Sequence, residues 1–232
     1  MSSLSSSLGD ALTNGLKQQA QDIGQAEQKK LIQFVELLNK WNKVYNLTSI
    51  RKPEEMISLH LLDSLVMLPF FSAAVAGENE IKRVLDVGTG GGIPGIPLAI
   101  CLPDIDFVLL DTRGKKIRFI QTVIAQLGLQ NVTAVHSRVE EFHVQEAEKF
   151  DRIISRAFAS LEDMLMLCQH LCYKQAGIRQ DGHKQGKFLA MKGQIPEEEI
   201  AQLPEGFRIE EINELKVSGL NARRHLIQIV FQ

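Results

Sequence analysis

A glycine-rich segment between two apolar stretches constrains the fold of this chain more than any other feature. Residues 84–87 (Val-Leu-Asp-Val) have the length of a buried strand, and four glycines follow within positions 88–92. Glycines at the end of a strand allow positive φ angles and let a ligand approach the backbone closely. Pro94 and Pro97 fit only near the start of a helix, where their missing N–H groups have no intrahelical partner. A strand, a glycine turn and a helix start in this order form the nucleotide-binding unit of open α/β sheets.

The residue types around the glycines discriminate between two kinds of nucleotide. The spacing Gly90-x-Gly92-x-x-Gly95 satisfies the dinucleotide fingerprint, so an NAD-dependent oxidoreductase is one alternative. Asp86 argues against it, because a dinucleotide-binding strand usually stays apolar where the pyrophosphate approaches. A carboxylate at that place favours a ligand that carries a cation, such as an amino group or a sulfonium. The loop Gly88-Thr89-Gly90 after Asp86 resembles the first motif of S-adenosylmethionine-dependent methyltransferases.

Composition sets limits on the class of protein. The 232 residues are 44% hydrophobic and 23% charged, which is enough for one α/β domain with an appendage. The net charge of -2 excludes a protein that is basic throughout, so any contact with RNA requires local basic patches. Three cysteines give no disulfide framework. The start of the chain lacks the pattern of a signal peptide, and no window approaches the about 20 apolar residues of a membrane span, so we expect a cytoplasmic protein with no membrane contact.

The pattern along the chain predicts one domain over residues 26–232, and the resemblance of its loop to the first methyltransferase motif implies that this is a methyltransferase domain. Residues 1–25 are rich in Ser and Gln, and we expect a flexible extension there that is frayed or loosely helical. Apolar residues at helical spacing predict a helix over 27–45, and Pro53 opens a second helix that runs to about Leu68. These helices form a helical cap over 26–70, ahead of a Rossmann-like core over 80–232.

Strands and helices then alternate regularly. Because such alternation produces a parallel sheet covered on both faces, the fold class is α/β, with a Rossmann-like, mostly parallel sheet of about seven strands. The expected strands are 84–87, 106–110, 132–136, 151–155 and 187–191, the expected helices are 114–127 and 160–173, and the end of the chain, 207–231, forms an antiparallel pair.

Several polar residues follow the ends of these strands, where open sheets bind ligands. Asp111 ends the second strand, at the place where a carboxylate binds the ribose hydroxyls of an adenosine ligand; alternatively it is solvated. The segment 138–142 is placed to pack against an adenine ring, or is only a loop into a short helix. Arg156 follows the fourth strand, where its guanidinium binds a cofactor carboxylate or an RNA phosphate, or forms a structural ion pair.

Two further groups of polar residues invite a functional interpretation. His60, Asp63 and Ser64 lie within five positions on one helix, where a hydrolase relay is geometrically awkward, so we expect a partly buried histidine with satisfied partners. Basic residues gather at 113–118, at 223–225 and in the loop 174–187. Each cluster alone is best explained as a solvated face, whereas several on one rim would form a surface that follows phosphates.

Together the motifs resemble the RsmG/GidB family of bacterial 16S rRNA guanine-N7 methyltransferases. The matching segments are Trp41–Ser49, His60–Ser64, Leu85–Gly90 with Pro94–Pro97, Ser137–Glu141, Ser155–Ser160 and Lys192-Gly193. The resemblance implies S-adenosyl-L-methionine as cofactor and 16S rRNA, or a small-subunit particle, as partner. It further implies that the cofactor-binding residues are Gly88, Ile93, Val139, Glu140 and Arg156, with Asp111 on the ribose.

The resemblance also sets expectations for the chemistry. N7 of guanine has a free lone pair at neutral pH, so no general base is required and none is assigned. No metal is expected, and the chain is expected to be a monomer. A non-catalytic RNA-binding assembly factor that retained the fold is left as an alternative, beside the NAD-dependent oxidoreductase.

Overall fold

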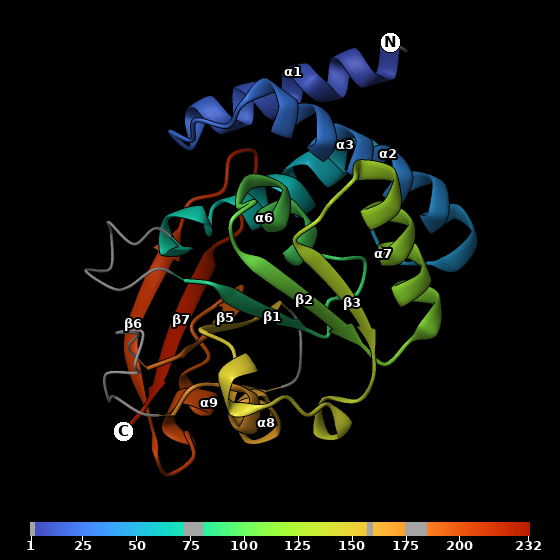
Figure 1. The fold of residues 1–232 in the computed structure, drawn as a ribbon. Helices are drawn as coiled ribbons and strands as arrows, with labels where there is room; N and C mark the ends of the chain where they lie inside the picture. The colour runs from blue at the N-terminus through green and yellow to red at the C-terminus, as the bar shows by residue number, and fades with distance from the viewer. Residues whose placement is uncertain (1–2, 72–80, 157–159, 175–184) are drawn as a thin grey trace.

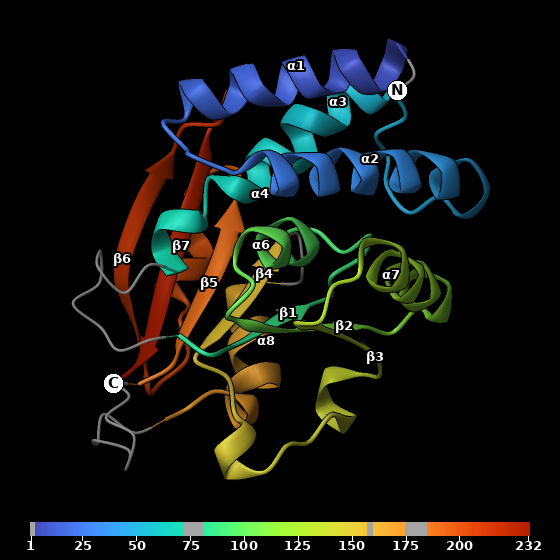
Figure 2. The ribbon, with the colours of Figure 1, turned by 45° about the horizontal axis from the view of Figure 1, so that its top comes forward.

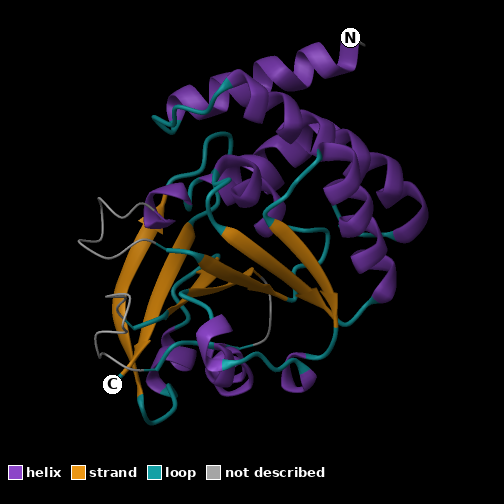
Figure 3. Cartoon of the chain, viewed as in Figure 1, coloured by secondary structure: helices purple, strands orange, loops and turns teal. Residues whose placement is uncertain are grey.

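The computed structural model describes residues 3–71, 81–156, 160–174 and 185–232, and shows a single seven-stranded sheet with helices on both faces (Figure 1, Figure 3). The strand order is β3-β2-β1-β4-β5-β7-β6. The strands are β1 (Arg83–Val87), β2 (Asp106–Asp111), β3 (Val132–His136), β4 (Arg152–Arg156), β5 (Lys187–Lys192), β6 (Phe207–Leu215) and β7 (Arg224–Phe231). The predicted fold class is therefore confirmed.

The first five strands are parallel, and β7 and β6 complete the sheet as an antiparallel pair. From β1 the chain builds outward through β2 to β3, then returns to the other side of β1 with β4. The strand order thus reverses between β1 and β4. In open α/β sheets this reversal opens a crevice at the carboxyl ends of the strands, which is where ligands bind.

Alternate side chains of each buried strand pack against opposite helix layers. Val84 of β1 joins the hydrophobic core under the N-terminal helices, whereas its neighbour Leu85 joins the core on the other face. In Figure 1, α6 (Gly95–Cys101) and α7 (Gly114–Leu127) lie on the first face, and α8 (Leu161–Cys168) and α9 (Glu197–Ala201) lie on the second. Apolar residues at consecutive strand positions explain how both faces are covered.

The helical cap begins earlier in the chain than predicted. Residues 3–18 form a helix, α1 (Ser3–Gln18), and its Leu8, Leu12 and Leu16 side chains are buried. In Figure 2, α1 lies along the outside of α2 (Gln25–Tyr45) and α3 (Pro53–Met56). Within the segment expected to be flexible, frayed or loosely helical, residues 3–18 thus form a packed helix, because leucines at every fourth position give this Ser-rich segment an apolar stripe that packs on the cap.

The other predicted elements differ from the structure mainly at their ends. Helix α7 has the predicted bounds and is closed by Gly128 at φ 63°. Ser160 caps α8 by accepting a hydrogen bond from the Asp163 backbone N–H at 3.1 Å. The predicted helix from Pro53 to Leu68 is broken into α3, a π-helical segment (Ile57–Leu62) and α4 (Asp63–Leu65), followed by a 3-10 turn (Leu68–Phe71). Of the helices described, none is both long and apolar enough to cross a membrane.

Candidate functional site

The loop after β1 carries the glycines and lies at the point where the strand order reverses. Gly88, Gly90 and Gly92 have φ angles of 67°, 62° and 78°. These values lie in the left-handed region, which is open to glycine and strained for other residues. The Thr89 backbone N–H donates to the Leu110 carbonyl at 3.1 Å, which turns the loop over the end of β2. The glycines are thus required by the path of the loop.

Asp86 supports this loop from below. Its Oδ2 accepts hydrogen bonds from the Thr89 hydroxyl at 2.6 Å and from the Gly95 backbone N–H at 2.9 Å. A β-carbon on Gly95 would lie 2.7 Å from the same oxygen and 3.0 Å from the Leu109 side chain. Gly95 is therefore needed for close packing of the helix start against β1 and β2. The sequence placed Asp86 at a cation-bearing ligand, and the structure adds this role in bracing the loop.

A second carboxylate, Asp111 at the end of β2, holds the loop from the side. Its Oδ2 accepts hydrogen bonds from the Gly90 backbone N–H at 3.0 Å and from Lys116 Nζ at 3.1 Å. Its Oδ1 accepts one from the Arg113 backbone N–H at 2.9 Å. Asp111 is only 5% exposed. Its three hydrogen-bond donors hold the carboxylate in place without a ligand. Oδ1 accepts only one of these bonds, so it has a further lone pair with which it can accept a bond from a ligand hydroxyl.

A cavity of about 300 Å³ opens between the ends of β1, β2 and β3, a size at the lower end of small-molecule sites. It is lined by residues from both sides of the sheet edge. They are Val87, Gly88, Leu110, Asp111, Thr112, Arg113, Lys116, Arg138, Val139, Glu140 and Leu167.

Four of the six predicted cofactor residues meet in this cavity, namely Gly88, Asp111, Val139 and Glu140. Val139 and Glu140 reach it from a short 3-10 turn (Val139–Glu141) after β3. Ile93 is a 6% exposed side chain in the core under the loop, and the lining does not include it. The four residues that line the cavity come from the ends of three strands, β1, β2 and β3.

Arg156, the sixth predicted residue, also lies outside the cavity lining. Its guanidinium donates to Asp63 Oδ2 at 2.8 Å, and Arg224 Nε donates to the other oxygen, Oδ1, at 2.7 Å. The Asp63 side chain is only 2% exposed. This ion cluster links the cap to β4 and to β7, so the structural ion pair, one of the alternatives for Arg156, is present.

The histidine beside this cluster has no relay geometry. His60 Nε2 lies 2.9 Å from the Thr48 hydroxyl, and Ser64 Oγ donates to the His60 carbonyl at 2.6 Å. Burial, with the positive charge of Arg156, lowers the pKa of His60 to about 4. The prediction of a histidine with satisfied partners is confirmed, although His60 is buried rather than partly buried, and no Ser-His-Asp relay is formed by these residues.

The electrostatics of Asp86 single it out among the buried acids. Burial raises its pKa from 3.8 to about 7, against the hydrogen bonds from Thr89 and Gly95 and the charge of Arg156. Its Oδ1 is buried and has no hydrogen-bond partner within the described part of the chain. A buried carboxylate with one unsatisfied oxygen is stabilised in its charged form by a nearby cation. The residues present therefore fit a cationic ligand better than a pyrophosphate.

Sequence reasoning missed part of the lining. Leu167 lies in the apolar α8, where its sequence context indicates only core. Lys116 was noted as part of a basic cluster, but its ion pair with Asp111 at 3.1 Å was not predicted. Residues 157–159 of the Ser155–Ser160 motif lie outside the described residues, as does most of the basic loop 174–187. Among described residues, no group of three His, Cys, Asp or Glu side chains is arranged to hold a metal ion.

Comparison with solved structures supports the fold. A SAM-dependent methyltransferase from Aquifex aeolicus superposes with a TM-score of 0.52 at 18% identity, over 77% of this chain and 98% of that one. A TrmN structure from Thermus thermophilus gives a TM-score of 0.51 at 15% identity, over 76% of this chain and 53% of that one. At these identities the similarity shows a shared fold.

Sequence comparison gives much closer relatives. A protein of Vibrio atlanticus named ribosomal RNA small subunit methyltransferase G is 46% identical over 224 residues, which cover 97% of this chain and 98% of that protein. The protein of the same name from Aeromonas salmonicida is 51% identical over 206 residues, 89% of each chain. The sequence model of GidB, the rRNA small subunit methyltransferase G family, matches residues 27–227. The chain therefore belongs to the rRNA small subunit methyltransferase G family.

Proposed function

We propose that this protein transfers a methyl group from S-adenosyl-L-methionine to N7 of a guanine in 16S rRNA. The observation that carries the proposal is the loop 88–95, braced by two buried carboxylates beside a cavity at the switch point of the sheet. Membership of a family whose members are named small-subunit rRNA methyltransferases supports the RNA substrate. Enzyme class, cofactor and substrate thus rest on the site and on the family together.

The proposed cofactor site uses the residues that line the cavity. Asp111 is positioned to accept hydrogen bonds from ribose hydroxyls, and Val139 and Glu140 flank the adenine, with an apolar side chain for the ring face and a carboxylate for its edge. Arg156 and Ile93 do not line the cavity, and they belong to the proposed site through their effect on the glycine loop. The charge of Arg156 lowers the pKa of Asp86, so its guanidinium lies within electrostatic range of the loop. Ile93 supports the loop from the core.

Asp86 would act on the charged end of the cofactor. Its unsatisfied Oδ1 and its raised pKa mean that a cation near the loop favours the ionised form. S-adenosyl-L-methionine supplies an electrophilic methyl group on a positively charged sulfur, whereas NAD presents a pyrophosphate. A buried negative charge under the loop thus favours the first ligand and disfavours the second.

The transfer itself needs positioning and no proton removal. N7 attacks the methyl carbon through its own lone pair, the C–N bond forms as the C–S bond breaks, and the electron pair of that bond stays on sulfur. The product guanine carries the positive charge. Holding the base in line with the methyl group supplies on the order of 7–11 kcal/mol. The target guanine must be accessible, as in a loop or an unstacked position.

The proposal is tested by methyl transfer in vitro. The protein is incubated with methyl-labelled S-adenosyl-L-methionine and either 16S rRNA or small-subunit particles that lack the modification, and the nucleosides are separated after digestion. We expect label in 7-methylguanosine. RNA binding with no label would support the non-catalytic assembly factor, and calorimetry that showed tight NAD binding with no binding of S-adenosylhomocysteine would support the oxidoreductase.

A further inference from the structure

Three aromatic rings run from the core to the surface at the end of α2. Phe119 of α7 is fully buried, and its ring centroid lies 5.6 Å from that of Trp41. The Trp41 ring lies 5.2 Å from that of Tyr45, at an interplanar angle of 31°. Tyr45 is 39% exposed, and Val44 beside it is 71% exposed. An aromatic ring this exposed, held from behind by a second ring, is a preorganised platform for stacking.

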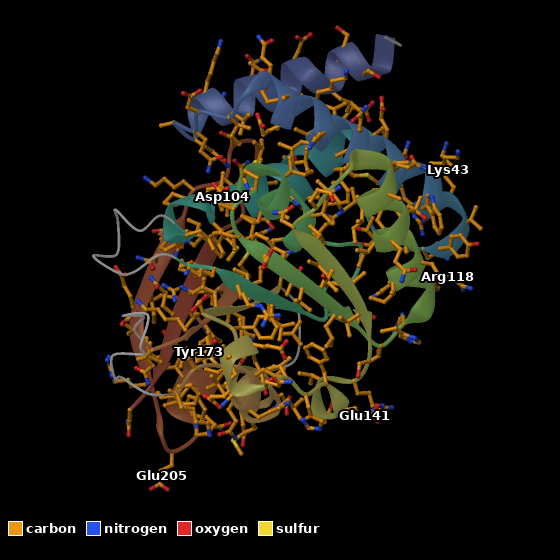
Figure 4. All side chains as sticks on the ribbon, in the orientation of Figure 1. Lys43, Asp104, Arg118, Glu141, Tyr173 and Glu205 are labelled. Atoms are coloured by element: carbon orange, nitrogen blue, oxygen red, sulfur yellow. The ribbon has the colours of Figure 1, made fainter. Side chains whose placement is uncertain are left out.

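Two segments that include the end of α2 and the whole of α7 carry many basic side chains. Residues 37–52 and 112–130 contain Lys40, Lys43, Arg51, Lys52, Arg113, Lys115, Lys116 and Arg118, and neither segment contains Asp or Glu. The chain as a whole has a net charge of -2, so these two segments are far more basic than the rest of the chain. In Figure 4, Lys43 of α2 and Arg118 of α7 lie on the same edge of the molecule.

The platform adjoins the cofactor loop. A β-carbon on Gly91 would lie 3.2 Å from Leu38 Cδ1 of α2 and 4.0 Å from Cβ of Leu47, which follows that helix, so the loop packs against α2 and the segment after it. On the other side, Lys116 binds Asp111 and lines the cavity. The exposed rings and the cavity are therefore connected through the same loop and the same helix, α7.

We propose that Tyr45, backed by Trp41, stacks on an unpaired base of the RNA substrate while the basic residues of α2 and α7 contact its phosphates. Single-stranded RNA is bound in this way, by aromatic side chains for the bases and a positive surface for the backbone. The inference rests on the proposed function, since it names the RNA surface of that same site. Its occupant is a nucleotide flanking the target guanine.

The first test uses the fluorescence of the intact protein. Trp41 is the one tryptophan of the chain, and its ring contacts Tyr45, so its emission reports on this platform directly. A single-stranded RNA of about ten nucleotides is within the usual length bound by such surfaces. We expect this RNA to quench Trp41 emission, with weaker binding at higher salt. Unchanged emission at an RNA concentration that saturates binding would overturn the proposal.

The second test separates stacking from apolar packing and from folding. Tyr45→Ala and Tyr45→Leu should each weaken RNA binding and raise the KM for small-subunit particles by about 5- to 100-fold, while Tyr45→Phe keeps the ring and retains both values. Affinity for S-adenosylhomocysteine is measured on every variant and should stay unchanged, and the thermal midpoint of each variant is recorded to confirm that it is folded at the assay temperature. Binding by Tyr45→Leu equal to that by Tyr45→Phe would overturn stacking.

Matched controls come from the opposite edge of the sheet. Ile212 and Arg208 are exposed residues of β6, and β6 lies farthest from β3 in the strand order. Ile212→Ala and Arg208→Gln should leave RNA binding unchanged, whereas Lys43→Gln weakens it. Equal loss in Arg208→Gln and Lys43→Gln would contradict a local surface.

Methyl transfer to RNA and base stacking by Tyr45 can be refuted independently of each other. If the wild-type protein does not methylate RNA, the proposed function fails, and the quenching of Trp41 still decides whether the surface binds RNA. If the wild-type protein methylates RNA and Tyr45→Ala has an unchanged KM, the stacking surface alone is refuted.

Discussion

Replacing Asp86 by asparagine should make the protein more stable at high pH and less able to bind its cofactor. The wild-type carboxyl holds a proton in the folded state up to about pH 7, whereas the unfolded chain releases it near 3.8. Between these values the folded state binds one proton more than the unfolded state, so stability falls as pH rises. Asparagine binds no proton and lacks this dependence.

The size of the effect follows from the pKa of Asp86. The difference between 3.8 and about 7, at 1.36 kcal/mol for each pH unit, corresponds to about 4 kcal/mol in total. From pH 5 to pH 8 the relevant interval ends at about 7, so about 3 kcal/mol is lost by the wild type alone. The amide adds a pH-independent cost of about 1–3 kcal/mol, because its NH₂ group takes the place of the unsatisfied Oδ1.

The assay is urea unfolding of wild type and Asp86→Asn at pH 5 and pH 8. The free energy of unfolding of the variant relative to wild type should rise by about 3 kcal/mol between the two conditions. Asp104→Asn is the control, because Asp104 is exposed and the substitution of an exposed residue should change the free energy of unfolding by less than about 0.5 kcal/mol. At pH 8 the affinity of Asp86→Asn for S-adenosyl-L-methionine should fall by about 1–3 kcal/mol, since the buried charge is lost.

If the free energies of unfolding of Asp86→Asn and wild type differed by the same amount at pH 5 and pH 8, the raised pKa of Asp86 would be contradicted. It would mean that Asp86 is ionised in the folded state at pH 5. A relative stability of the variant that fell with increasing pH would contradict even the sign, since it would place the folded pKa below the unfolded one.

The remaining predictions concern packing and the ion cluster. Gly95→Ala should lower the free energy of unfolding by about 1–3 kcal/mol and weaken cofactor binding, because the new β-carbon would lie 2.7 Å from Asp86 Oδ2. The control is Gly193→Ala, since a β-carbon there has no atom within 4 Å. It should change neither the thermal midpoint nor the cofactor affinity measured by calorimetry. Leu12→Ala should cost about 2–5 kcal/mol in urea unfolding if α1 belongs to the folded core, and exposed Lys17→Ala less than about 0.5; equal effects would contradict the packing of α1. Asp63→Asn should cost about 3 kcal/mol, because two guanidinium groups lose their shared carboxylate; a neutral result would show that solvent replaces the pair.

Local signals explain which elements were predictable from sequence. Helix α7 was predicted with its observed bounds because a glycine ends it at the left-handed position, and β3 because its short apolar run stands between polar turns. The glycine loop and Asp86 were likewise local, within ten residues of each other. Four predicted cofactor residues converge because parallel strands end at one edge of the sheet.

Other features depended on partners distant in the sequence. The ion cluster joins Asp63 to Arg156 and Arg224, which lie 93 and 161 positions away, so no local pattern announced it. The packing of α1 was signalled by Leu8, Leu12 and Leu16, but the serine content around them suggested a flexible chain. The place of Leu167 in the cavity followed from how α8 packs under the sheet, which composition does not reveal.

The central claim is that this chain makes 7-methylguanine in 16S rRNA. The most direct measurement treats 16S rRNA with borohydride and aniline, which cleave the strand at that base, and maps the breaks by primer extension. RNA from a strain that lacks the chain is compared with RNA from the same strain carrying the wild-type protein or Gly95→Ala. We expect one cleavage that is absent in the deletion strain, restored by the wild type and reduced with Gly95→Ala. A cleavage of equal strength in the deletion strain would contradict it.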